Sequence, residues 1–182
     1  MCGIILATSS SGIEDIIPSL KSALNSLNHR GPDNASYLYD HNIFLGHTRL
    51  AIIGLDSASN QPFSYENLSL IYNGEVFNYI EIRENLQNKG YIFETESDTE
   101  VVLKAFHCFG TDCFNLFNGM WALAIHDKKN NELIVSRDRF GQKSLFYTLI
   151  NDKLVFASEL HAIALVHRSK PNYSEIKSFI QE

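Results

Sequence analysis

Apolar residues occur along this chain in two patterns, short continuous runs and a spacing of three or four residues, which predict strands and helices respectively. Apolar runs of five or six residues, bounded by turn-forming residues, predict strands. These runs cover residues 4–8, 35–39, 43–48, 68–72, 120–125, 132–136, 145–149 and 153–157. The polar residues 40–42 predict a hairpin between the second and third runs. The fourth run leads into Asn73, Gly74 and Glu75, a sequence typical of a polar turn.

Apolar residues spaced three or four apart predict helices between these strands. The first helix covers 13–27, where Pro18 is tolerable because it falls near the first turn. The second covers 79–86 and closes at Gly90, and the third covers 101–109 after a capping box at 97–100. A short helix is expected at 159–164. The polar residues 171–182 look like the start of another helix.

The order of these elements favours an α+β fold. The strands are joined mostly by short turns, which favours antiparallel pairing, and no internal repeat is present. An amphipathic helix must cover an apolar face of a sheet. We therefore expect two antiparallel sheets covered by helices in one domain.

Composition and charge exclude several classes of protein. The chain has 182 residues, of which 45% are hydrophobic and 20% charged, and its net charge of −6 argues against a nucleic-acid partner. It has no glycine-rich phosphate loop, no signal peptide and no apolar run long enough to cross a membrane. Three cysteines, an odd number, favour a reducing compartment, so we predict a cytoplasmic protein.

His107, Cys108 and Cys113 offer side chains that can bind a metal. Their spacing is loose and no fourth ligand is near in the sequence. We therefore interpret Cys108 and Cys113 as structural thiols on helices, and we expect neither a metal nor an organic cofactor.

Cys2 is the strongest candidate for chemistry. Removal of Met1 would leave a residue that carries both a thiol and a free α-amine. The thiol is a nucleophile, and the amine can carry a proton to and from it, because the unperturbed pKa values are about 8.5 and about 8. An early cysteine alone is weak evidence, so other residues must support this hypothesis.

Six motifs in a fixed order provide that support. The chain resembles the glutamine-hydrolysing domain of class II amidotransferases, the N-terminal-nucleophile group. It is most similar to the N-terminal half of glutamine-dependent asparagine synthetases. The motifs are Cys2-Gly3-Ile4, Arg30-Gly31-Pro32-Asp33, Gly46-His47-Thr48-Arg49-Leu50-Ala51-Ile52, Asn73-Gly74-Glu75-Val76-Phe77-Asn78, Ser97-Asp98-Thr99-Glu100 and Arg137-Asp138-Arg139-Phe140-Gly141.

The resemblance implies a four-layer α/β/β/α sandwich and a role for each matched residue. It implies that Cys2 is the nucleophile, and that the Asn73 amide and the Gly74 backbone N–H stabilise the oxyanion. It also implies that Arg49 binds the α-carboxylate of glutamine and Asp98 its α-ammonium. Leu50, Ile52 and Glu75 are expected to complete the substrate pocket.

Each of these residues also has a structural interpretation. Asp98 stabilises a helix start without any ligand, Arg49 suits a strand edge, and Asn73 with Gly74 suits a plain turn. We expect Arg30 and Asp33 to pair with each other and hold a loop. His47 is expected to pack or hydrogen-bond rather than catalyse, and residues 137–141 to be scaffold near a second domain.

The resemblance further implies a domain at 1–165, with 166–182 beginning a linker to an ATP-pyrophosphatase synthetase domain or subunit. The Ser-Gly-Gly-x-Asp-Ser loop of such a domain is absent from this sequence. The reaction expected is hydrolysis of L-glutamine to L-glutamate and ammonia through a Cys2 thioester. Two alternatives remain: another acceptor, such as a sugar acid or peptide carboxylate, and a silent binding or regulatory module. The sequence leaves the oligomeric state open, a homodimer included.

Overall fold

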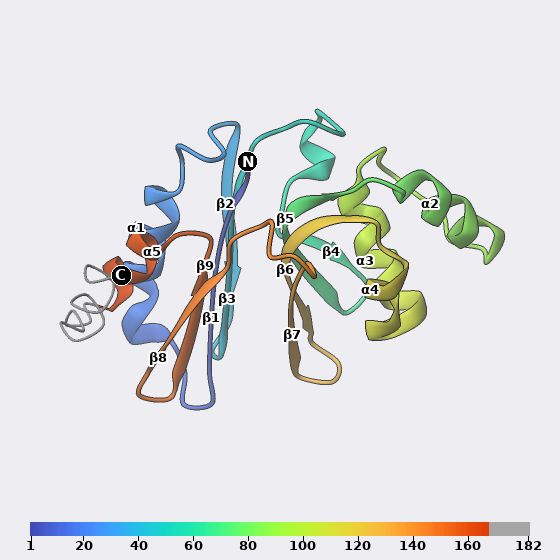
Figure 1. The fold of residues 1–182 in the computed structure, drawn as a ribbon. Coiled ribbons are helices and arrows are strands. Elements are labelled where there is room, and N and C mark those ends of the chain that lie inside the picture. The colour runs from blue at the N-terminus through green and yellow to red at the C-terminus, as the bar shows by residue number, and fades with distance from the viewer. Residues whose placement is uncertain (168–182) are drawn as a thin grey trace, which may run out of the picture.

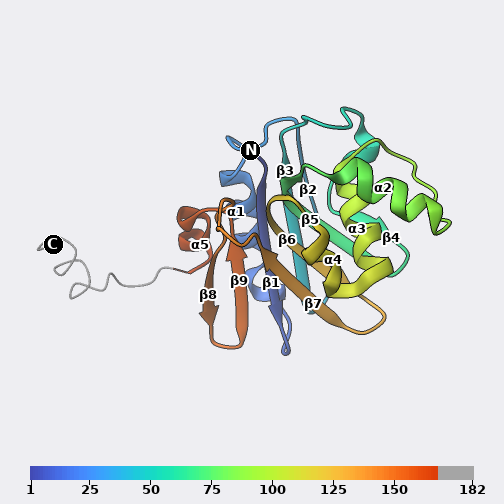
Figure 2. The same cartoon turned by 45° about the vertical axis from the view of Figure 1, so that its right-hand side comes forward.

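The computed structural model describes residues 1–167, in which two antiparallel sheets face each other between two layers of helices (Figure 1). The α+β, four-layer α/β/β/α sandwich expected from the sequence is confirmed. The same layers are visible after a rotation of 45° (Figure 2). The helix expected at 171–182 lies outside the described residues.

The first sheet has the strand order β2-β3-β1-β9-β8. Its strands are β1 (Gly3–Ser9), β2 (Asn34–Tyr39), β3 (Ile43–Arg49), β8 (Phe146–Ile150) and β9 (Lys153–Ala157). β1 therefore lies at the centre, paired with β3 on one side and with β9 on the other. The hairpin between β2 and β3 is present, and the Asp40 carboxylate accepts from the backbone N–H groups of Asn42 and Ile43.

The second sheet has the order β4-β5-β6-β7. Its strands are β4 (Phe63–Tyr65), β5 (Leu68–Val76), β6 (Gly119–Asp127) and β7 (Glu132–Arg137). The short strand β4 was not expected from the sequence, because three residues are too few to show a period.

Helices cover the outer face of each sheet (Figure 1). α1 (Ile17–Ser26) and α5 (Leu160–Val166) lie on the first sheet, while α2 (Tyr79–Asn88), α3 (Asp98–Phe109) and α4 (Cys113–Leu116) lie on the second. Three single-turn 3₁₀ helices, η1 (Glu14–Ile16), η2 (Ser57–Ser59) and η3 (Gly110–Asp112), complete the set. η1 precedes α1, so Pro18 falls in the first turn of α1, where its missing N–H costs nothing.

Alternation along β1 divides the core between two layers. Ile5 and Ala7 pack against α1 and α5, whereas Ile4 and Leu6 pack against the second sheet. This is the two-residue period of a strand buried on both faces. Between the sheets the second sheet contributes small side chains, Ala122 and Ala124.

The turn expected at Asn73-Gly74-Glu75 is wrong. β5 continues through these residues to Val76, and Asn73, Gly74 and Glu75 lie opposite Ala122, Trp121 and Met120 of β6. Pairing with β6 thus overrides the turn propensity of Asn-Gly. A Cβ at position 74 would lie 2.4 Å from the Met120 carbonyl oxygen, so the glycine permits the close approach of β6.

The capping box at 97–100 is only half formed. The Ser97 hydroxyl accepts from the backbone N–H of Thr99 at 3.1 Å, as expected for an N-cap. Glu100 does not return to the Ser97 N–H. Its carboxylate instead accepts from the backbone N–H groups of Glu94 and Thr95 and pairs with Lys104 at 2.6 Å.

No helix of the described part of the chain is long and apolar enough to cross a membrane. Within residues 1–167 no group of three metal-binding side chains is close enough to hold an ion. Cys108, half-buried on α3, and Cys113, buried on α4, are both free thiols, and their structural role stays a prediction.

Candidate active site

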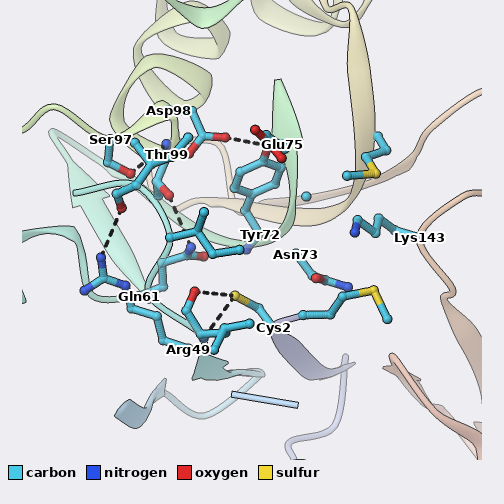
Figure 3. A pocket seen from close by; sticks show the side chains of 16 residues that line it. Cys2, Arg49, Gln61, Tyr72, Asn73, Glu75, Ser97, Asp98, Thr99 and Lys143 are labelled. Atoms are coloured by element: carbon cyan, nitrogen blue, oxygen red, sulfur yellow. Dashed lines mark hydrogen bonds between the residues drawn. The ribbon is translucent and has the colours of Figure 1, made fainter. Parts of the chain in front are cut away.

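One cavity of about 210 Å³ brings together all eight site residues expected from the sequence (Figure 3). Strands of both sheets and the start of α3 contribute to its wall. The lining residues are Met1, Cys2, Arg49, Leu50, Ile52, Ile53, Gln61, Tyr72, Asn73, Gly74, Glu75, Ser97, Asp98, Thr99, Met120 and Lys143.

The thiol of Cys2 is held by the backbone that follows β3. Cys2 Sγ accepts from the Leu50 N–H at 3.4 Å and lies 3.7 Å from the Leu50 carbonyl oxygen. Burial raises the pKa of the Cys2 thiol, an effect that the Leu50 N–H, the N-terminal amine and the Arg49 guanidinium only partly offset. The thiol is therefore protonated at neutral pH and needs a base to become a nucleophile.

Asn73 lies in the same cavity with an unused donor. The residue is 1% exposed, and its Nδ2 has no hydrogen-bond partner among the described residues. A buried amide donor without a partner is costly, and this one lies where a ligand in the cavity could accept from it. Strand β5 fixes this amide, since Asn73 pairs with Ala122 of β6.

Asp98 stands at the start of α3 as a buried carboxylate with two donors. Tyr72 Oη donates to its Oδ2 at 2.9 Å, and the Val76 N–H donates to the same oxygen at 3.3 Å. Burial raises the pKa of Asp98, while these two hydrogen bonds lower it, and the net direction is upward. Burial and the Asp98 charge together raise the pKa of Tyr72 well above its usual value, so the tyrosine stays a donor.

Arg49 does not present a free guanidinium to the cavity. Its Nη1 donates to the Asp56 carbonyl at 2.7 Å and to Asn60 Oδ1 at 2.8 Å. Its Nη2 donates to the Gly54 carbonyl and, at 3.4 Å, to that of Ile53. The side chain therefore also secures the loop after β3, and a bound carboxylate would have to replace some of these carbonyl contacts.

The expected pairing of Arg30 with Asp33 is wrong, because each residue holds a different segment. Asp33 Oδ2 accepts from the Ala51 N–H at 2.8 Å. Arg30 instead donates from Nε to the Cys2 carbonyl at 2.9 Å and from Nη1 to Glu159 at 2.6 Å. Asp33 therefore holds the segment after β3, and Arg30 joins Cys2 to Glu159.

His47 is buried completely. Its Nε2–H donates a hydrogen bond to the Tyr72 backbone carbonyl, and the two atoms lie 3.2 Å apart. Burial lowers the pKa of His47 to about 3, so the ring is neutral. This hydrogen bond joins β3 to β5 and agrees with a packing role.

Sequence reasoning assigned no role at the site to Tyr72, Gln61 and Lys143, which also line the cavity. Tyr72 directly precedes Asn73, and the need of a buried Asp98 carboxylate for a hydrogen-bond donor was the signal that could have identified it. Gln61 bridges the sheet and α3, accepting from the Tyr72 N–H and donating to Thr99 Oγ1. Lys143 points into the cavity (Figure 3), and the Asp138 carboxylate accepts from its backbone N–H and from those of Trp121, Phe140 and Gln142.

Several known proteins are similar to this chain in sequence or in fold. A chain of similar sequence is asparagine synthetase [glutamine-hydrolyzing] 1 of Bacillus subtilis (strain 168), which is 45% identical over 133 residues, covering 72% of this chain and 21% of that protein. A putative asparagine synthetase [glutamine-hydrolyzing] 2 of Methanocaldococcus jannaschii is 37% identical over 190 residues, covering 91% of this chain and 35% of that protein. This chain thus spans about a fifth to a third of these relatives.

A solved structure of similar fold is the glutamine phosphoribosylpyrophosphate amidotransferase of B. subtilis. It superposes with a TM-score of 0.76 at 25% identity, covering 91% of this chain and 43% of that one. The sequence pattern of the family described as "Glutamine amidotransferase domain" matches residues 1–181. The chain therefore belongs to the glutamine amidotransferase domain family.

Proposed function

We propose that this domain hydrolyses L-glutamine to L-glutamate and ammonia, with Cys2 as the nucleophile. The observation that carries the proposal is the pairing, in one cavity, of the Cys2 thiol with the unpartnered amide of Asn73. Acyl transfer requires a nucleophile and, in the same cavity, a rigidly held hydrogen-bond donor that can stabilise the oxyanion.

The chemistry follows from these two groups. The thiol sulfur attacks the side-chain amide carbon of glutamine, and its proton passes to the base. The carbonyl oxygen gains negative charge and is stabilised by the Asn73 amide and the Gly74 N–H. Collapse of the intermediate breaks the carbon–nitrogen bond, the base returns the proton to the leaving nitrogen, and ammonia departs. Water then cleaves the thioester and yields glutamate.

The base in this proposal is the α-amine of Cys2 itself. In the chain that retains Met1, the Cys2 nitrogen lies in a peptide bond and cannot accept a proton. His47 does not replace it, because burial lowers its pKa to about 3 and its Nε2–H donates to the Tyr72 backbone carbonyl. Removal of Met1 is therefore part of the proposal.

Substrate recognition is assigned to the other cavity residues. The Asp98 carboxylate matches an α-ammonium, and the Arg49 guanidinium matches an α-carboxylate once it exchanges its long contact to the Ile53 carbonyl. Leu50, Ile52 and Glu75 complete the wall. No metal or organic cofactor takes part.

The use made of the ammonia is a second level of the proposal. The two curated relatives described above are named asparagine synthetases, and each is about three to five times as long as the part that matches. We propose that residues 1–165 form the ammonia-producing domain and that 166–182 lead to an ATP-dependent synthetase partner, whose acceptor is aspartate or another carboxylate.

The test compares ammonia release by the processed chain and by Cys2→Ala. The substitution should abolish release and leave the circular dichroism spectrum unchanged, while Cys108→Ala, on α3, should remain fully active. A second comparison uses a chain with an uncleavable N-terminal tag, which should be at least about a hundredfold slower. Equal rates with the tag confirmed by mass spectrometry would rule out the α-amine as base.

A rival function, a silent binding module, is favoured if Met1 stays on. Intact-mass measurement of the purified chain distinguishes the two. Glutamine binding without any ammonia release by the processed chain would establish the rival.

A further inference from the structure

We propose that Glu159 is a positioning residue for the nucleophile, acting through Arg30. The proposal rests on Cys2 being the nucleophile. Glu159 lies in none of the six motifs and outside the cavity lining, so it would not touch the substrate. Its effect is exerted on the backbone that carries the thiol.

The contacts form a short chain from Glu159 to Cys2. Glu159 Oε1 accepts from Arg30 Nη1 at 2.6 Å, and Arg30 Nε donates to the Cys2 carbonyl at 2.9 Å. The Arg30 side chain is 9% exposed, so it is removed from most of the screening that weakens surface pairs. One guanidinium thus joins the junction of β9 and α5 to the residue that bears the thiol.

The neighbouring residue secures the same segment. Ser158 donates its backbone N–H to the Ile4 carbonyl at 3.0 Å, and its hydroxyl accepts from the Ile4 N–H at 3.0 Å. Ser144 donates to the Ser158 carbonyl at 2.8 Å. Residues 158–159 therefore hold the beginning of β1 at two points, Cys2 and Ile4.

The Glu159 carboxylate is itself fixed from three sides. His29 Nε2 lies 3.2 Å from Oε1, and His161 Nδ1 lies 3.1 Å from Oε2. The second nitrogen of each ring faces the Ser26 carbonyl. The Arg30 hydrogen bond, with that of His29, lowers the pKa of Glu159, so the carboxylate is charged at neutral pH.

A clamp at this place has a clear purpose. A chain end frays unless something holds it, and a shift of about 1 Å in a reacting group costs on the order of a hundredfold in rate. The carbonyl of Cys2 is on the side away from its α-amine. Arg30 can therefore hold the residue without occupying the group proposed as base.

The experiment compares Glu159→Ala with Glu14→Ala in the processed chain. Glu159 is the N-cap of α5 but makes no cap hydrogen bond, so alanine there should fold. Glu14 is the matched control, since it also pairs with a histidine, His41, at an exposed site. We expect Glu159→Ala to lower kcat at least tenfold with KM within twofold, Glu159→Gln to recover to within threefold, and Glu14→Ala to match the wild type.

Arg30→Ala provides the second test. If Glu159 acts through Arg30, the Arg30→Ala/Glu159→Ala variant should have the kcat of Arg30→Ala alone. An unchanged kcat in Glu159→Ala, or a further tenfold fall in the double variant, would overturn the proposal.

A chemical readout separates this proposal from the glutaminase assignment. Loosening the start of β1 should expose the thiol, so iodoacetamide should alkylate Cys2 at least threefold faster in Glu159→Ala, measured on the Cys2 peptide. If the wild type releases no ammonia, the proposed function fails, and this rate still tests the clamp. Equal alkylation rates in Glu159→Ala and Glu14→Ala would refute it.

Discussion

At the scale of single residues, two groups of the candidate site stand ready for a substrate. The Cys2 thiol is kept protonated by burial, and Asn73 Nδ2 is kept without a partner. The unpartnered amide of Asn73 costs stability in the empty domain. Under the proposed function, this cost is recovered when the carbonyl group of a substrate accepts from the amide.

Asn73→Ala should chiefly lower kcat, by about a hundredfold to a thousandfold, because the amide binds the oxyanion more strongly than the neutral carbonyl. KM should change little. Steady-state ammonia release measures both constants, and Asn85→Ala on the surface of α2 serves as the control. A normal kcat with a raised KM would assign Asn73 to substrate binding instead.

Tyr72→Phe should shift the pH dependence of substrate binding. Burial raises the pKa of Asp98 and the Tyr72 hydroxyl lowers it, so removing the hydroxyl should raise that pKa further. Only the charged carboxylate binds an ammonium, so the pH below which kcat/KM falls should move upward, with kcat at pH 8 nearly unchanged. A profile of kcat/KM against pH measures this shift. If kcat/KM falls at the same low pH in Tyr72→Phe and in the wild type, the charge of Asp98 does not control substrate binding.

At the scale of elements, two features differ from the sequence-based expectation because contacts with other segments outweigh a local conformational preference. The Asn73-Gly74 pair has the composition of a turn, but nine residues of β5 pair continuously with β6. Glu100 has the position of a capping-box acceptor, but it binds the segment before α3 instead. Sequence periodicity could predict the strand and the helix, whereas these partners depend on segments that only folding brings together.

Glu100→Gln should destabilise the domain by about 3 kcal/mol at pH 7, since it leaves buried Lys104 without its carboxylate. Burial raises the pKa of Glu100, but hydrogen bonds from Lys104, Glu94 and Thr95 outweigh it, and the net direction is downward. A lowered pKa gives stability that is present above the unfolded value of about 4.3 and is lost as pH falls through the folded value.

Urea unfolding at pH 7 and near pH 3 measures this contribution. The difference between wild type and Glu100→Gln should shrink as the pH falls. Glu14→Gln, which breaks the exposed pair with His41, should cost less than about 0.5 kcal/mol at either pH. A constant difference for Glu100→Gln would show that the loss is one of packing alone.

At the scale of the whole molecule, the sequence could predict the two sheets, their helical cover and the eight cavity residues. It could not predict that Arg30 joins Cys2 to Glu159, nor that Asp33 holds Ala51. Arg30 and Asp33 have opposite charges and lie three residues apart, so the sequence suggests that they pair with each other. The true partners are 129 and 18 residues away along the chain, and no local period reveals them.

Ala124→Leu should test whether the spacing of the sheets sets the site. Ala124 packs between the sheets, so a larger side chain should separate them, destabilise the fold by about 1–3 kcal/mol and lower kcat. Ala23→Leu, in the core between α1 and the first sheet, should cost similar stability and leave kcat unchanged. Thermal unfolding and ammonia release, both measured well below the melting temperature, would separate the two effects; equal kcat values would contradict the idea.

The central position of β1 has a consequence for how the domain folds during its synthesis. Among the described strands β1 emerges from the ribosome first, yet one of its two neighbours, β9, is the last of them to be translated. At ribosomal speeds of about 5–20 residues per second, this strand waits roughly ten to thirty seconds for that partner. During that interval β1, a largely apolar strand, can pair with β3 on one side but keeps an open edge on the other, where chaperones would limit aggregation. The contacts from residues 158–159 to the start of β1 also form only after β9 has been made, so we expect a nascent chain that ends before β9 to release no ammonia.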